Sequence, residues 1–266
     1  MSSYNGSCDY TSRGMVQALF GSAPFQANGG DRLVSKAVGA AIAALFKRSD
    51  KVEANVRAEP VTKLLQGSVD GFDFIGNGML MYNGLRIAVM ELYLQAVSID
   101  FGAIFSGQVK LRQPTQATMR VVLTEEDLTV SFNTPFVVDK LQRLQYQGQP
   151  LKFSETQMTI TPNKTLRLQS QVKVGDAVQP TQIEFETEVD VIERRKIQFA
   201  NVTYKGDEES VNLSQALIDH VNNILDLDKF ALDGTQLRVD RIRLQNESIV
   251  FYGTANINRF PQMKRR

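Results

Sequence analysis

The segment from Gly84 to Leu128 constrains the fold most, because its apolar residues alternate with polar ones and the alternation changes parity along the way. Apolar residues follow one parity up to Val89, the other parity from Met90, and the first again from Val97. Successive side chains of a strand point to opposite faces, so a change of parity requires a bulge or a bend. The segment therefore predicts a curved antiparallel sheet with one apolar face.

The N-terminal part of the chain is predicted to form one helix followed by strands. Residues 31–48 are expected to be helical, with Asp31 as the N-cap. Strands are expected within residues 52–111, where Asn83 and Gly84 stand between two alternating runs and predict a hairpin turn. This half is therefore expected to place a helix against a sheet.

A pair of short helices is expected where the alternation stops. Thr124 and Asp127 have the spacing of a capping box, in which each side chain accepts a hydrogen bond from the other residue's backbone N–H. Pro135 suits the first position of a second helix, because its missing N–H would have no partner there.

The second half repeats the order of strands and then a helix. Strands are expected over residues 156–199, a helix from Ser210 or Asn212 to about Leu227, and a closing hairpin over residues 236–257. Separate blocks of strands and helices indicate an α+β fold. We therefore predict curved antiparallel sheets wrapped around helices.

The domain organisation follows from composition and from this order. Residues 1–30 are rich in Ser, Gly and Asn and are predicted to form a disordered tail, and residues 263–266 a basic tail. Residues 31–262 are predicted to form a single domain. Within it, two diverged strand–helix blocks are expected at about 50–146 and 150–228.

Charge and composition exclude several classes of protein. The 30 basic and 29 acidic residues give a net charge of +1, so no overall field favours nucleic acid. The single cysteine, Cys8, excludes an intramolecular disulfide. We see neither a signal peptide nor a run of about 18 apolar residues that would span a membrane. We expect a cytoplasmic or stromal-side protein, soluble or peripheral to a membrane.

Several short motifs occur in the order found in one protein family. They are Leu64-Leu65-x-Gly67, Gly84-Leu85-Arg86-Ile87, Glu91-Leu92, Ile99-x-Phe101, Gly107-x-Val109-x-Leu111-Arg112-x-Pro114 and the run 120–128. With these motifs the chain resembles the DUF2993 family of LmeA-like phospholipid-binding proteins, in its cyanobacterial or plastid branch, over about residues 31–262. The resemblance implies a fold similar to tubular lipid-binding (TULIP-like) folds, and phospholipid as a partner. Its motifs are structural and not catalytic.

The apolar face of the predicted sheet is the main candidate for a binding site. Methionine and phenylalanine suit an adaptable cavity for acyl chains, and they suit an irregular core equally well. Both interpretations stay open. The candidate lining residues are Phe72, Phe74, Met79, Met81, Met90, Leu92 and Leu94 in the sheet, with Val137, Leu141 and Leu144 on one face of the second short helix.

Arg238, Arg241 and Arg243 are candidates for contact with anionic headgroups. They alternate with apolar residues and are expected on the solvent side of a strand. Each basic residue near a membrane surface contributes about 1 kcal/mol of attraction. The alternative is an ordinary solvated face.

Residues for catalysis, metal binding or a cofactor are not predicted. The only histidine, His220, falls at the edge of an apolar helical stripe, where a structural hydrogen bond is the usual role. The carboxylates of Glu125, Glu126 and Asp127 fall in the first turn of a helix, where negative charge favours the helix dipole. A P-loop and a nucleophile elbow are absent from the sequence.

Three functions remain, in decreasing order of support. The first is a non-enzymatic protein that holds or carries an amphiphile between a curved sheet and helices. The second is an interaction or assembly factor for a membrane complex, for example a photosynthetic one, with a fully packed core. The third is an enzyme such as a hydrolase or an esterase, for which the sequence offers no nucleophile–base pair.

Overall fold

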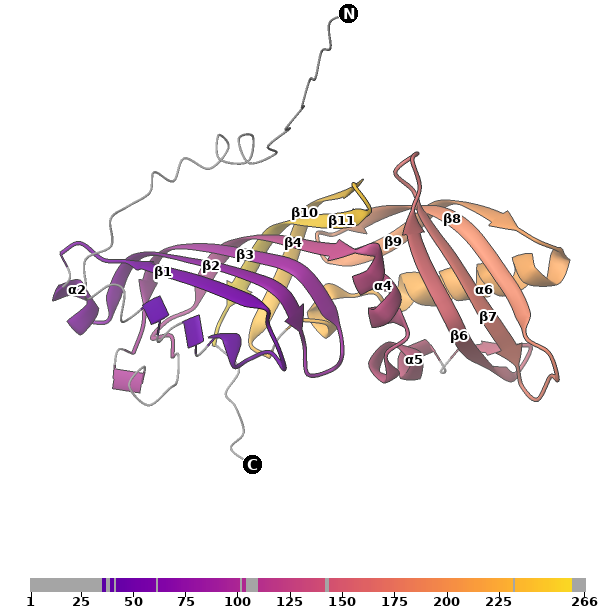
Figure 1. The fold of residues 1–266 in the computed structure, drawn as a ribbon, viewed down its shortest axis with the longest axis horizontal. Helices are drawn as coiled ribbons and strands as arrows, with labels where there is room; N and C mark the ends of the chain where they lie inside the picture. The colour runs from indigo at the N-terminus through magenta and orange to yellow at the C-terminus, as the bar shows by residue number, and fades with distance from the viewer. Residues whose placement is uncertain are drawn as a thin grey trace, which may run out of the picture.

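The computed structural model shows two antiparallel sheets that lie end to end along the long axis of the molecule (Figure 1). The structure describes residues 35–36, 39–40, 42–60, 62–100, 102–103, 110–141, 144–231 and 233–259, and of residues 64 and 65 the backbone alone. The predicted tails, 1–30 and 263–266, and the predicted N-cap Asp31 lie outside the described residues.

The first sheet has six strands in the order β1-β2-β3-β4-β11-β10. Their bounds are β1 Lys51–Arg57, β2 Ser68–Leu80, β3 Arg86–Ser98, β4 Thr115–Thr124, β10 Thr235–Gln245 and β11 Ser248–Ile257. Each neighbouring pair is antiparallel. The closing hairpin is thus confirmed, and it pairs with β4 to complete a sheet that begins near the start of the chain.

The curvature of the first sheet is confirmed, and it coincides with the changes of parity in β3 (Figure 1). The β2–β3 pairing is interrupted at Ala88 and at Ala96, and Ala96 has a positive φ of 51°. Because of these bends, Ile87, Met90 and Val97 contribute to the same core although their parities differ. The side that they share is called the concave face below.

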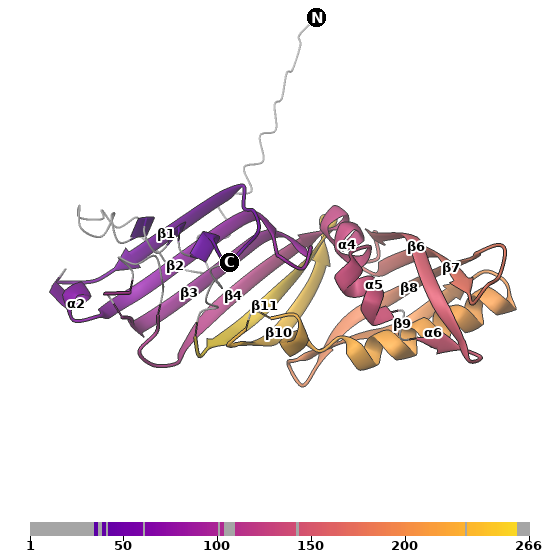
Figure 2. The same ribbon diagram turned by 90° about the horizontal axis from the view of Figure 1, so that it is seen from below.

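The second sheet has five strands in the order β5-β6-β7-β8-β9. The bounds are β5 Gln145–Tyr146, β6 Gln149–Ile160, β7 Leu166–Val174, β8 Thr181–Ile192 and β9 Lys196–Lys205. The helices are α2 Thr62–Leu65, α4 Glu125–Phe132, α5 Pro135–Leu141 and α6 Glu208–Ile224, with the 3-10 turn η1 at Leu227–Lys229. The long helix α6 lies along the inner side of the second sheet, and α4 and α5 lie between the two sheets (Figure 2).

The predicted starts of two helices are confirmed and a third is wrong. Thr124 and Asp127 form the capping box of α4, and Pro135 is the first residue of α5. Helix α6 is capped by Asp207, whose carboxylate accepts a hydrogen bond of 2.9 Å from the N–H of Ser210. Aspartate caps as well as serine does, and here Ser210 is buried on the inner side of the first turn.

Several boundaries also differ from those predicted. Strand β6 begins at Gln149 and not near Thr156. A bulge with Glu155 at a φ of 52° interrupts the alternation within the strand, so the sequence pattern indicates only its second half. Helix α6 ends at Ile224, and Leu227 begins the separate turn η1.

The predicted N-terminal helix ends earlier than expected. Its described helical residues fall within 35–43, and Arg48 instead forms an isolated antiparallel bridge with Leu80. Ile42 and Phe46 from this segment are buried in the first core.

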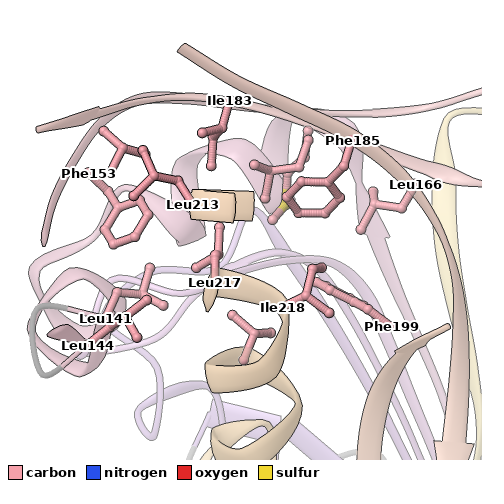
Figure 3. Close-up of a cluster of buried hydrophobic side chains, with 14 of the residues drawn as sticks. Leu141, Leu144, Phe153, Leu166, Ile183, Phe185, Phe199, Leu213, Leu217 and Ile218 are labelled. Atoms are coloured by element: carbon pink, nitrogen blue, oxygen red, sulfur yellow. The ribbon is translucent and has the colours of Figure 1, made fainter. Parts of the chain in front are cut away.

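Two hydrophobic cores result, one for each sheet. The first lies on the concave face of the six-stranded sheet. In the second, Phe185 of β8 faces Leu213 and Leu217 of α6, while Leu141 closes one side (Figure 3). The side chains that pack against both cores are Val191, Leu227, Ile242 and Phe251. The fold is therefore α+β, with curved antiparallel sheets against helices, as predicted.

Candidate amphiphile-binding site

A row of half-buried apolar side chains crosses the concave face of the first sheet. Met90 pairs with Val121, Val121 pairs with Phe251, and Phe251 pairs with Ile242. All four side chains are half-buried and pack against the first core. Because Phe251 and Ile242 also pack against the second core, we call these four residues the junction row.

The neighbouring row along the strands is more fully buried than the junction row. The next row along the strands contains Phe74, Leu92, Met119, Gly253 and Val239. All of these except Leu92 are buried. Packing therefore buries most side chains of one row, while all four side chains of the junction row keep some exposure.

The dimensions of the junction row suit a hydrocarbon chain. The row spans three steps between neighbouring strands, and strands are about 4.8 Å apart, so its length is about 14 Å. An amphiphile lying across it would bury apolar surface on both itself and the protein.

The structure places the residues predicted from the sequence in three settings. Phe72, Phe74, Met79 and Leu94 are buried in the first core. Met81, Met90 and Leu92 are half-buried and pack against that core. Val137, Leu141 and Leu144 belong to the second core or pack against it. The sheet residues and the helix residues of the predicted set therefore do not line one common surface.

Sequence reasoning missed three of the four members of the junction row. Val121, Phe251 and Ile242 each carry the alternation of a half-buried strand, which was a usable signal. Alternation cannot tell which strands are neighbours, however. The row forms only because β11 pairs with β4 across more than a hundred residues of chain.

A hollow lies between the N-terminal helical segment and the edge strand β1. Its volume is about 520 Å³, and its apolar wall includes Val52 and Ala54 of β1. A Cβ added at Gly39 would lie 3.0 Å from the Cβ of Ala54, so helix and strand approach closely here. Lys36 and Glu53 lie among its polar lining residues.

The three predicted arginines of β10 differ in their surroundings. Arg241 and Arg243 are exposed, with their guanidinium carbons 4.6 and 6.0 Å from the ring centroid of Tyr252. Arg238 is half-buried and forms an ion pair of 2.9 Å with Asp228. Only the first two therefore present a cation to solvent.

The convex face around Tyr252 also holds an ion pair. Arg120 is paired with Tyr252 in the sheet and forms a salt bridge of 2.7 Å with Glu91. Burial, together with the charge of Glu91, raises the pKa of Tyr93 on the same face. The charges of Arg120 and Glu91 compensate one another, which leaves Arg241 and Arg243 as cations on this face.

The titratable side chains of His220 and Asp127 form hydrogen bonds that serve the fold. His220 donates a hydrogen bond of 3.2 Å from Nε2 to the backbone carbonyl of Lys140, as its position at the edge of the stripe predicted. The carboxylate of Asp127 accepts from the N–H and the hydroxyl of Thr124. In the part of the chain that the structure describes, no group of three His, Cys, Asp or Glu side chains is placed to hold a metal ion.

The first sheet is curved and carries half-buried apolar side chains on its concave face, while α6 packs against the second sheet. The model of the family described as LmeA-like phospholipid-binding matches residues 25–254. The chain therefore belongs to this family, which confirms the family resemblance seen in its sequence. No curated protein and no solved structure matches the chain.

Proposed function

We propose that this protein binds a phospholipid or a related amphiphile non-covalently and without chemical conversion, with an acyl chain lying along the junction row. The observation that carries the proposal is the half-burial of Met90, Val121, Phe251 and Ile242 in one continuous row. Membership of a phospholipid-binding family supports the same class of ligand.

The energetics of such binding require little polar recognition. Each methylene group that leaves water contributes about 0.8 kcal/mol. Met90 is a flexible and polarizable side chain, so the row can adapt to chains of different shape. The neighbouring row on the same face, which includes the buried Phe74 and Met119, supplies a rigid support beside it.

We further propose that the protein meets the membrane surface peripherally, with Arg241 and Arg243 toward anionic headgroups. Both guanidinium groups are exposed and lie over the ring of Tyr252. Tyrosine favours the boundary between water and lipid, and each basic residue adds about 1 kcal/mol near an anionic surface. Among the described residues, no helix is long and apolar enough to cross a membrane.

The proposal predicts that Val121→Asn weakens lipid uptake. The amide would place a polar group against the acyl chain. Native mass spectrometry after incubation with phospholipid vesicles would measure the lipid-bound fraction. The matched control is Val89→Asn, which changes another half-buried valine, next to Met90 and therefore on the opposite face of β3.

We expect Val121→Asn to lower the bound fraction severalfold and Val89→Asn to leave it near that of the unmodified protein. The melting temperature of both variants would show whether they are folded. If the unmodified protein takes up no lipid, and added phospholipid does not raise its melting temperature, the proposed function is wrong.

A further inference from the structure

Helix α4 runs beside β6 and bonds to its edge in the way that a further strand would (Figure 2). The side-chain amide of Asn133 accepts a hydrogen bond of 3.3 Å from the N–H of Thr156 and donates one of 2.8 Å to its carbonyl. One helical turn earlier, the hydroxyl of Thr129 accepts from the N–H of Met158 at 3.0 Å. One turn earlier still, the carboxylate of Glu125 accepts from the next outward N–H of β6.

The dimensions of helix and strand explain this match. Residues four apart in a helix rise about 6.0 Å along its axis, and residues two apart in a strand are about 6.7 Å apart. Every fourth side chain of a helix can therefore reach every second residue of an edge strand. In α4 all three such positions carry an oxygen that accepts a hydrogen bond, so this edge of β6 is closed.

The N-terminal helical segment has the same relation to β1 but fills only the first position. The hydroxyl of Ser35 accepts a hydrogen bond of 3.0 Å from the N–H of Val56. Four residues later Gly39 lies against Ala54, two residues back along β1. The next position is taken by Ala43. Neither Gly39 nor Ala43 has a side chain that can bond to the strand.

Two residues of β1 consequently have open backbone groups. Alternate residues of an edge strand direct their N–H and C=O groups away from the sheet, and because Val56 does so, Val52 and Ala54 do as well. Among the described residues, none forms a hydrogen bond with these outward groups. The hollow of about 520 Å³ lies at this place, and its volume is within the range of about 300–1,000 Å³ that is usual for binding pockets.

We propose that this hollow binds an extended segment of a partner protein, which adds antiparallel to β1 as a seventh strand of the first sheet. Its main chain pairs with Val52 and Ala54, and its side chains toward Ala40 and Ala43 are small or apolar. Lys36 is exposed in the lining at the Ser35 end, so the N-terminal residue of the segment is acidic. The inference goes beyond lipid binding and does not depend on it.

The test measures binding of the peptide acetyl-Asp-Thr-Val-Thr-Val-Thr-amide, with a fluorophore at its C-terminal end, to the full chain by fluorescence anisotropy. We expect saturable binding, because main-chain pairing supplies the affinity. Ala43→Asn should weaken it about tenfold, since the new amide bonds to the strand as Asn133 does in α4. The matched control is Ala177→Asn in the exposed turn after β7, which should bind as the unmodified protein does.

The charge of Lys36 provides a second readout. Lys36→Glu should weaken binding of this peptide severalfold and strengthen binding of the same peptide with lysine in place of aspartate. Lys47→Glu reverses an exposed charge outside the lining of the hollow and should leave the difference between the two peptides unchanged. An equal effect of both substitutions would contradict the assigned orientation and overturn the inference.

Hydrogen exchange followed by NMR locates the bound peptide. We expect the N–H groups of Val52 and Ala54 to exchange severalfold more slowly when the peptide is present. The inference is overturned if the unmodified protein does not bind the peptide, if protection appears elsewhere, or if Ala43→Asn binds as tightly as Ala177→Asn. Protection of these two N–H groups by phosphatidylglycerol vesicles, without protection by the peptide, would assign the hollow to lipid and overturn it as well.

Discussion

At Thr124 one side chain ends a strand and starts a helix. Its hydroxyl accepts a hydrogen bond of 3.1 Å from the N–H of Asp127, and the Asp127 carboxylate accepts one of 3.1 Å from the N–H of Thr124. The pair is recognisable in sequence because both partners are three residues apart. The cap of α6 was harder to find, since Asp207 and Ser210 are both suitable residues.

We predict that Thr124→Ala lowers the free energy of unfolding by about 1 kcal/mol, because the first turn of α4 loses its cap. Denaturant unfolding would measure it. Thr124→Ser retains the hydroxyl and should restore most of the stability, whereas Thr118→Ala at an exposed site of the same strand should have a smaller effect. Equal losses in Thr124→Ala and Thr118→Ala would contradict the role of the cap.

At the scale of elements, the bends of β3 were predictable and its neighbours were not. The local alternation of apolar residues changes parity at Met90 and at Val97, and the structure has bends nearby at Ala88 and Ala96. Pairing of β4 with β11 depends on contacts that no local pattern encodes. For that reason the sequence indicates Met90 as a candidate residue but not Phe251 of the same row.

The strands β7, β8 and β9 share a charged cluster on one face. Glu184 accepts hydrogen bonds from Lys205 at 2.8 Å and from Gln169 at 2.7 Å, and Glu186 accepts from Arg167 at 2.9 Å. These bonds, with the nearby positive charges, lower the pKa of both glutamates. The carboxylates are therefore more stable as anions in the folded state than in the unfolded one.

We predict that this contribution to stability is fully present above the ordinary glutamate pKa of 4.5 and is lost as pH falls below it, through the lowered folded-state values. Unfolding free energies measured between pH 6 and pH 3 would show the decline. The double variant Glu184→Gln, Glu186→Gln should be less stable at pH 6, and its unfolding free energy should change less with pH. The prediction would be contradicted if the unfolding free energy of the double variant depended on pH as steeply as that of the control Glu155→Gln.

At the scale of the whole molecule, the fold class was predictable from the order of strand and helix blocks. The number of sheets and their relative placement were not, because they depend on the return of the last hairpin to the first sheet (Figure 1). The division into blocks at 50–146 and 150–228 stays a prediction. Of the three arginines predicted to contact headgroups, Arg241 and Arg243 remain candidates because their side chains are exposed. Arg238 instead forms an ion pair with Asp228.

We predict that the double variant Arg241→Gln, Arg243→Gln floats less with anionic vesicles, because two surface cations contribute about 2 kcal/mol of attraction. Flotation with vesicles containing phosphatidylglycerol would measure it, and the difference should shrink at high salt. Lys152→Gln with Lys164→Gln removes the same charge from exposed positions on β6 and in the turn between β6 and β7. If both double variants float equally, these arginines do not mark the membrane-facing side.

The place of β11 in the first sheet sets an order of events during synthesis. The ribosome releases β1 to β4 first, yet the edge of β4 receives its partner only when Ser248–Ile257 emerges. Until then the N–H and C=O groups along that edge are available to other chains. The nascent protein must pass through a stage in which its first sheet is incomplete, and a helper that shields this edge during translation would act on residues 115–124.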